Sequence, residues 1–582
     1  MSAKRYGIIT QINANMVTVS FDTFVIQNEV AYVIHADERL KSEVISVRDN
    51  TAQMQVYEST AGLKVGEKVE FSEGLLSVEL GPGLLGQIFD GLQNPLPLLA
   101  QKCGYFLKRG FYLDALSHED TWEFTPLVKP QDRILPGQGL GFVPEKIFKH
   151  YIMAPFSLSA ASEVVEIAPL GKYSAKQRIA LLKDADGKET EVFLNQSWPV
   201  KIPIRAYSEK LKPLKPLVTK MRIIDSFFPV ALGGTYCLPG PFGAGKTVLQ
   251  QLTSRHAEVD VVVIAACGER AGEVVETLKT FPKLIDPRTN KPLIDRTIII
   301  CNTSSMPVAA RESSVYTAVT IAEYYRQMGL HVLLLADSTS RWAQAMREIS
   351  GRLEEIPGEE AFPAYLESRI ASFYERAGLV RLYDGSIGSV TIGGTVSPAG
   401  GNFEEPVTQA TLKVVGAFHG LSRERSDARR YPAVDPLISW SKYSSFIDQK
   451  QVRLGHEILR KSHEIAQMMK VIGEEGTSLA DYIVYLKGEF LDFVYLQQNA
   501  FDKADEASSK ERQVYVFNFI YNILGSEFFF SDNEGARHYF QKLRQLFNGW
   551  NSSLWQSDDF KNSEREITLL LNELIQKDRV NV

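Results

Sequence analysis

The chain has 582 residues, of which 44% are hydrophobic and 23% are charged, an ordinary composition for a soluble protein of several domains. Its 64 basic and 70 acidic residues leave a net charge of −6, which gives no general electrostatic attraction for nucleic acid. No apolar run is long enough to span a bilayer, and no signal-peptide core follows the N-terminus. We therefore expect the chain to reach a membrane only through partner proteins.

Short, alternating strands are predicted over residues 1–72. Val17, Val19 and Phe21 alternate with polar residues, which is typical of half-buried strands. A small β-barrel is the natural closure for such a segment because a barrel has no exposed sheet edges. Residues 77–86 interrupt the alternation and mark the transition to the next domain.

A second strand-rich segment is predicted over residues 110–200. Gly137, Gly139 and Gly141 resemble a nucleotide loop, but no helical pattern follows them, so we interpret them as a turn. Residues 211–216 contain two prolines and two lysines, a composition typical of linkers.

An α/β domain is predicted from about residue 217 to residue 440. Continuous apolar runs at 261–266, 297–300 and 331–336 indicate strands that are buried on both faces. Between the last two runs, apolar residues recur at helical spacing. This alternation predicts a mostly parallel sheet that binds ligands beyond the C-terminal ends of its strands.

Helical patterns dominate residues 441–582, which we interpret as a C-terminal helical domain. Two apolar stripes are expected to pack in its core rather than to bind a cofactor. The stripes comprise Ile458, Ile465, Met468, Met469 and Ile472, and Ile567, Leu570, Leu571 and Leu574. The predicted fold class is thus multidomain α/β, with a β-barrel, a second β-rich segment, an α/β domain and a helical domain.

The clearest chemical signal is residues 240–247 (GPFGAGKT), which fit the phosphate-binding loop pattern. Glycines let successive N–H groups point at phosphate oxygens, while Lys246 would reach the β- and γ-phosphates and Thr247 would bind Mg²⁺. An apolar approach precedes the loop, and Val248, Leu249 and Leu252 suit the buried face of a following helix. The predicted nucleotide ligands are Gly240, Pro241, Phe242, Gly243, Ala244, Gly245, Lys246, Thr247 and Val248.

Carboxylates at the ends of two predicted strands supply the rest of a hydrolytic site. Asp337 ends the run 331–336, where it would support Mg²⁺ or, alternatively, cap a helix. Glu269 would polarise the attacking water, and Glu273 competes with it for this role. Arg270 and Arg341 are candidate γ-phosphate contacts, although exposed or structural ion pairs would explain both equally well.

Eight motifs extend the pattern over nearly the whole chain, and with them the chain resembles the catalytic A subunit of the V/A-type rotary ATPases, in its bacterial or archaeal form. The motifs are SVELGPGLLG (77–86), GPFGAGKT (240–247), GER (268–270), NTSSMPVAAR (302–311), ADSTSRW (336–342), EISGRLEE (348–355), PAVDPLISWS (432–441) and LQQNAF (496–501).

This resemblance implies ATP/ADP turnover with Mg²⁺, coupled to H⁺ or Na⁺ movement across a membrane through a rotating stalk. It implies that residues 110–200 form a β-rich bulge inserted into a nucleotide-binding domain of residues 73–109 and 201–440. It also implies an alternating hexamer of three such chains and three B-type subunits, with central and peripheral stalk subunits. The complex would lie on the cytoplasmic face of the membrane, would reach the ion-translocating sector indirectly, and would bind no nucleic acid. The arginine finger would come in trans from the B-type subunit, so no residue of this chain is assigned that role.

By motif position, the resemblance makes Glu269 the water-activating carboxylate and Tyr431 an aromatic wall for adenine, with Phe501 as a second wall. From the sequence alone, core packing explains both aromatic residues equally well. Phe242 matches the V/A catalytic subunits, and Ala244 stands where some eukaryotic members have a cysteine, so no redox switch is expected in the loop.

Three alternatives stay open at this point. An F-type β subunit or a secretion-system ATPase shares the loop but has no insertion of the 110–200 kind. A ring-shaped nucleic-acid translocase shares the nucleotide core but needs a basic or aromatic path for a strand. A non-catalytic nucleotide-binding subunit would not need Lys246, Thr247 and Glu269 together.

Overall fold

The computed structural model describes residues 4–104, 108–241, 243–304 and 306–580. Its contacts divide the chain into two compact units, which are described separately below. Unit 1 comprises residues 1–212, 259–396 and 404–414, and unit 2 comprises residues 213–258, 397–403 and 415–582. Within the part of the chain that was searched, no helix has the length and apolarity needed to cross a membrane.

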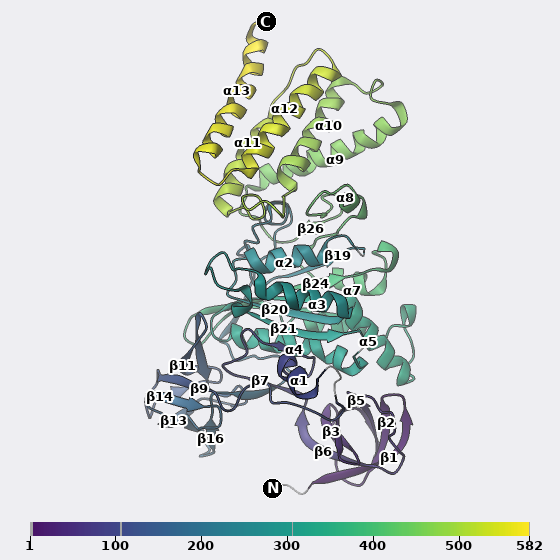
Figure 1. Ribbon diagram of the computed structural model, residues 1–582, viewed down its shortest axis with the longest axis vertical. Helices are drawn as coiled ribbons and strands as arrows, with labels where there is room; N and C mark the ends of the chain where they lie inside the picture. Colours follow the sequence, from purple (N-terminus) through teal and green to yellow (C-terminus); the bar gives the residue numbers. More distant parts are fainter. Residues whose placement is uncertain (1–3, 105–107, 242, 305, 581–582) are drawn as a thin grey trace. The chain divides into compact units, whose positions relative to one another are not determined.

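The N-terminal part of unit 1 is a closed six-stranded barrel with strand order β1-β2-β5-β4-β3-β6, drawn in purple in Figure 1. Strand β1 alternates as the sequence predicts: Gly7 and Ile9 are buried, whereas Tyr6 and Ile8 face outward. The strands are β1 (Arg5–Asn13), β2 (Met16–Phe21), β3 (Glu29–His35), β4 (Glu38–Arg48), β5 (Thr51–Val56) and β6 (Lys68–Leu75).

The insertion of unit 1 contains two small antiparallel sheets with a common apolar core. The first has the order β10-β13-β15-β16 and the second β12-β11-β9-β14, while β7 pairs with β17. The strands are β7 (Ser77–Leu80), β9 (Thr121–Pro126), β10 (Arg133–Ile134), β11 (Gly139–Glu145), β12 (Phe148–Met153), β13 (Ser162–Ile167), β14 (Gly171–Ser174), β15 (Ala180–Lys183), β16 (Glu189–Val192) and β17 (Gln196–Pro199).

One prediction for the insertion was wrong. Gly139 and Gly141 lie in strand β11 and not in a turn, and only Gly137 has a positive φ, of 75°. A Cβ at Gly141 would lie 2.3 Å from a ring carbon of Phe124, so this glycine permits close packing between strands. The segment expected to be only a domain transition also contains a strand, β7.

The remainder of unit 1 is a largely parallel sheet covered by helices. Its strand order is β24-β22-β20-β21-β8, and the antiparallel strand β23 pairs with β24 and with β18. Strand β20 is an almost continuous run of buried residues, as expected for a strand with helices on both faces. Helix α4 is buried along nearly its whole length.

The strands of this sheet are β8 (Ile88–Phe89), β18 (Glu209–Leu211), β20 (Val261–Glu269), β21 (Thr297–Thr303), β22 (His331–Asp337), β23 (Gly378–Arg381) and β24 (Ile387–Val396). The helices are α1 (Leu96–Cys103), α3 (Ala271–Thr280), η2 (Phe281–Lys283), η3 (Leu293–Arg296), α4 (Val308–Arg326), α5 (Thr339–Arg352), η4 (Glu359–Ala361), α6 (Leu366–Tyr374) and α7 (Pro406–Val414).

Unit 2 combines three hydrogen-bonded strands, of order β26-β25-β19, with the C-terminal helices drawn in green and yellow in Figure 1. Side chains of Asp448, Ser478, Ser509 and Asp532 cap the first turns of α9, α10, α11 and α12. The elements are η1 (Ile223–Phe227), β19 (Thr235–Pro239), α2 (Lys246–His256), η5 (Ala399–Gly401), β25 (Ala417–Phe418), α8 (Arg423–Asp427), β26 (Trp440–Ser441), α9 (Gln449–Ile472), α10 (Leu479–Leu491), η6 (Asp492–Leu496), α11 (Lys510–Gly525), α12 (Asn533–Ser552) and α13 (Asp558–Val580).

The predicted fold class is confirmed, whereas the predicted domain boundaries stay predictions. One helical stripe is only partly buried: Ile458 and Ile465 lie in the core, but Met468 and Ile472 at the end of α9 are 40% and 48% exposed. Helical spacing shows that residues lie on one face of a helix. It does not show how much of that face is covered by other parts of the protein.

Candidate functional site

The phosphate-binding loop follows strand β19 and leads directly into helix α2 in unit 2. Gly243 and Gly245 have φ values of 81° and 83°, a backbone conformation in which other residues are strained. A Cβ at Gly240 would lie 2.7 Å from the Cβ of Leu421, so this position has no room for a side chain. The open N-terminus of α2 therefore presents its N–H groups beside a turn that suits an anion.

Lys246 is the first residue of α2, and its side chain folds back over the loop. Its Nζ donates to the carbonyl oxygen of Gly240 at 2.7 Å and to Oγ of Ser397 at 2.8 Å. Both acceptors are neutral, and hydrogen bonds from an ammonium group to an anion are stronger. A phosphate group would thus compete well for Lys246. Thr247 is exposed in the same turn.

One expectation for the residues that flank the loop was wrong. The strand before the loop is β19, which starts at Thr235, and the apolar approach that includes Phe227 forms the helical turn η1. Val248 does not belong to the buried face of α2: it is 45% exposed and lines a cavity, whereas Leu249 is 2% exposed. Phe242 lies outside the described residues.

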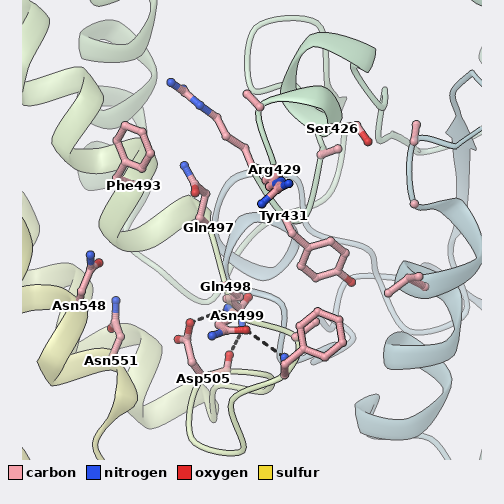
Figure 2. Close-up of a pocket in the computed structure, with 18 of the residues that line it drawn as sticks. Ser426, Arg429, Tyr431, Phe493, Gln497, Gln498, Asn499, Asp505, Asn548 and Asn551 are labelled. Atoms are coloured by element: carbon pink, nitrogen blue, oxygen red, sulfur yellow. Dashed lines mark hydrogen bonds between the residues drawn. The ribbon is translucent and has the colours of Figure 1, made fainter.

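A cavity of about 780 Å³ begins at the loop and lies entirely within unit 2 (Figure 2). The P-loop contributes Gly243, Ala244, Gly245 and Val248 to its wall. The other walls come from the end of α8, from the segment after η6 and from α12. They are formed by Ser426, Ala428, Arg429, Arg430, Tyr431, Ala433, Phe493, Gln497, Gln498, Asn499, Ala500, Phe501, Asp505, Arg544, Asn548, Asn551 and Ser552.

Both aromatic residues predicted to flank a base line this cavity. Tyr431, labelled in Figure 2, and Phe501 both belong to the cavity wall, and Phe501 is 98% exposed. Aromatic rings in a cavity wall provide faces on which a planar base can stack. Burial raises the pKa of Tyr431, so its hydroxyl keeps its proton.

The cavity fits a nucleotide in size and in chemistry. Its volume is typical of pockets for small organic ligands, which combine apolar walls with a few polar groups. Among the described residues, Oη of Tyr431 and Nε2 of Gln497 are buried without a hydrogen-bond partner, and buried polar groups generally have one. Both atoms can donate to a ligand. Sequence reasoning missed Gln497, although it lies inside the motif LQQNAF.

In unit 1, the structure brings Glu269, Asp337 and Arg341 together at the C-terminal edge of the parallel sheet. Strands β20 and β22 are neighbours and end at Glu269 and Asp337. A bulge precedes Glu269, where Gly268 has a φ of 70° and a Cβ would lie 3.0 Å from the Cβ of Arg341. Lys246 and Thr247 belong to unit 2, so a common role for the two groups of residues stays a prediction.

The structure places Asp337 next to the N-cap position of α5 and not at it. The N-cap residue is Ser338, while Oδ1 of Asp337 accepts a hydrogen bond from Oγ1 of Thr395 at 2.6 Å. Arg341 donates to Gln344 at 3.5 Å. The roles expected for Asp337 and Arg341 stay predictions. Arg270 is exposed before α3, and the side chain of Glu273 lies outside the described part.

The cysteines near these residues are structural. Cys237 and Cys267 are buried, and burial raises the pKa of Cys267 to about 12, so the reactive thiolate does not form near neutral pH. Burial also raises the pKa of Cys301 to about 12. Cys103 is only half-buried.

His419 packs next to Tyr236 in unit 2, and its protonation should affect stability. Its Nε2 contacts the carbonyl oxygen of Phe228 at 2.8 Å, and burial lowers the pKa of the imidazole from 6.5 to about 4. Because the folded state resists protonation, the free energy of unfolding should fall by about 3 kcal/mol as the pH decreases from 6.5 to 4. We expect His419→Gln to weaken this dependence in thermal unfolding measured between pH 4 and 7.

The matched control is His538→Gln, since the side chain of His538 is 72% exposed. This control should unfold with the pH dependence of the unsubstituted chain. If His419→Gln shows that same dependence, the proposed burial effect is wrong.

Four family models match successive parts of the chain. They are described as the ATP synthase alpha/beta family beta-barrel domain (residues 9–73), the ATPsynthase alpha/beta subunit barrel-sandwich domain (113–201), the ATP synthase alpha/beta family nucleotide-binding domain (220–441), and the C-terminal domain of V and A type ATP synthase (450–525).

Similar proteins extend over nearly the full length of the chain. V-type ATP synthase alpha chain 1 of Treponema pallidum (strain Nichols) is 63% identical over 565 residues, which is 97% of this chain and 96% of that protein. The V-type ATP synthase alpha chain of Treponema denticola is 64% identical, over 96% and 95% of the two chains. That of Borrelia garinii subsp. bavariensis is 60% identical, over 98% and 99%.

Proposed function

The chain belongs to the ATP synthase alpha/beta family, among its V-type alpha chains, and from this premise we propose how its residues bind and turn over ATP. It is the catalytic ATPase and ATP synthase subunit of a rotary complex with other subunits, and the complex couples ATP turnover to ion transport. The observation that carries the proposal is the cavity of unit 2, which joins the phosphate-binding loop to the aromatic walls at Tyr431 and Phe501.

In this proposal, the loop binds the phosphates of the nucleotide and the cavity binds its base. The N–H groups of residues 240–247 bind the phosphates, and Lys246 exchanges its contacts with Gly240 and Ser397 for the β- and γ-phosphate oxygens. The base stacks against Tyr431 and Phe501, and Val248 covers its apolar edge. Arg429, Gln497 and Asn548 line the same cavity and were not identified from the sequence.

The hydrolytic step is proposed for the strand-end residues of unit 1. Glu269 accepts a proton from the attacking water, as a positioned general base does. Arg270 and Arg341 neutralise charge that develops on the γ-phosphate. Thr247 and Asp337 are the proposed residues for Mg²⁺, since hydroxyl and carboxylate oxygens suit this ion. The bound ion would supply charge neutralisation between the β- and γ-phosphates.

The proposed assembly is an alternating hexamer with a B-type subunit, on the cytoplasmic face of the membrane and connected to central and peripheral stalks. A B-type arginine finger completes each site in trans. The alternatives of an F-type β subunit, a secretion ATPase or a nucleic-acid translocase are not favoured, because residues 450–525 match the C-terminal domain of V and A type ATP synthases.

Purification of the native complex from membranes tests this function. We expect an ATPase whose subunits include this chain and a B-type partner, whose activity disappears with EDTA and returns with added Mg²⁺. Replacing Na⁺ in the assay identifies the coupled ion. A complex that contains the intact chain but binds and hydrolyses no ATP would contradict the proposal.

A further inference from the structure

The cavity wall contains five consecutive residues, Gln497 to Phe501, which we call the amide loop because three of them carry carboxamide side chains. This loop follows η6 and contributes one of the two aromatic walls. The following inference rests on the proposed function. It concerns which nucleobase the site accepts.

A buried ion pair fixes the backbone of the amide loop. Arg222 is 2% exposed, donates from Nε to the carbonyl oxygen of Tyr495 at 2.8 Å and from Nη2 to that of Gln497, and pairs with Asp505. The second carboxylate oxygen of Asp505 accepts the backbone N–H of Asn499 at 2.7 Å (Figure 2). Charge-assisted hydrogen bonds of this kind are the stronger ones, so they hold the loop in one conformation.

The side chain of Asn499 is oriented within this loop. Its Oδ1 accepts the backbone N–H of Phe501 at 3.0 Å, an interaction that only the oxygen of the amide can make. This bond defines which end of the amide is Nδ2, and Nδ2 is a donor only. Within the part of the chain that the structure describes, Nδ2 has no hydrogen-bond partner, and Asn499 is exposed where it lines the cavity.

The side chain of Gln498, the preceding residue, has no free donor for a ligand because both ends of its amide have hydrogen-bond partners. Oε1 of Gln498 accepts the backbone N–H of Arg222 at 2.5 Å, and Nε2 donates to the carbonyl oxygens of Lys220 and Asp505. Gln498 is 4% exposed and therefore supports the loop. Asn499 is thus an exposed amide donor of the cavity wall, two residues before Phe501 in the chain.

We infer that Asn499 is a specificity-determining residue that selects adenine over guanine and hypoxanthine. Adenine presents the ring atom N1 as an acceptor, whereas guanine and hypoxanthine carry a hydrogen on N1. A fixed Nδ2 donor makes a hydrogen bond with adenine N1 but meets another donor in the other two bases. A site that leaves polar groups unpaired discriminates against the wrong ligand.

The test compares kcat/KM for ATP, ITP and GTP in the purified complex. Asn499→Asp keeps the size of the side chain but replaces the donor by an acceptor. For Asn499→Asp, we expect the ratios of kcat/KM for ATP to ITP and for ATP to GTP to fall about 10-fold. For Asn499→Ala, we expect them to fall about 3-fold. Both magnitudes follow from the usual contribution of one hydrogen bond. ITP lacks the 2-amino group of GTP and so isolates the effect at N1.

Asn548→Asp is the matched control, because Asn548 lines the same cavity from α12 and the substitution adds the same charge. Repulsion between the new carboxylate and the phosphates changes kcat/KM for all three nucleotides by the same factor, so the ratios stay unchanged. An active complex in which Asn499→Asp also leaves the ratios unchanged overturns the inference but not the proposed function. A wild-type complex without ATP turnover overturns both.

Discussion

Glu269→Gln in the purified complex is expected to lower kcat for ATP hydrolysis by about 10²- to 10⁴-fold, the usual contribution of a positioned general base. The amide keeps the size of the side chain but cannot accept a proton from water. Glu269 ends strand β20 after a bulge, so its backbone position depends on the sheet and should not change. Steady-state ATPase assays measure the effect, and nucleotide binding should change little because the proposed phosphate contacts come from the phosphate-binding loop and Lys246.

Glu276→Gln provides the control for this substitution. Glu276 is exposed on helix α3, one element beyond Glu269, and should retain normal turnover. Turnover of Glu269→Gln within a factor of about two of the control would assign the general base to another residue, and Glu273→Gln would then be the next variant to measure.

The isolated chain is expected to hydrolyse Mg-ATP about 10³- to 10⁵-fold more slowly than the complex, because an arginine finger is supplied in trans by the neighbouring subunit. The cavity of unit 2 is formed by this chain alone, so ATP binding to the isolated chain should persist. Single-turnover hydrolysis by purified monomer, compared with the monomer after addition of the B-type subunit, measures the difference.

Two controls make this comparison specific. Lys246→Ala should abolish binding in both samples, since it removes the cation of the phosphate-binding loop. A B-type subunit whose arginine finger is replaced by alanine should bind the chain without restoring turnover. Rapid turnover by the monomer alone would contradict a shared active site.

The phosphate-binding loop was predictable because its chemistry is local. Residues 240–247 need only each other and the first turn of α2 to present N–H groups, and the positive φ values of Gly243 and Gly245 agree with this expectation. Val248 was predicted on the buried face of α2 but lines the cavity. Helical spacing does not show whether the first turn of a helix contacts the core or a cavity.

The strand-end carboxylates were also accessible from the sequence, since an apolar run followed by an acid indicates the edge of a parallel sheet. The sequence did not show that these carboxylates lie close to Arg341. The contact of Arg341 with Gly268 depends on the bulge in β20 and on the start of α5, neither of which has a signature in the residues alone.

The sequence by itself thus determined the fold class, the phosphate-binding loop, and the strands that end at Glu269 and Asp337, because periodicity and short motifs depend on neighbouring residues. Only the tertiary structure decided the rest of the cavity wall, in which Asn499 and Arg544 join Gly243 and Tyr431. These residues are far apart in the chain, and their proximity depends on side-chain packing and on the buried pair of Arg222 with Asp505. The orientation of the Asn499 amide follows from that packing, and no local pattern of residues encodes it.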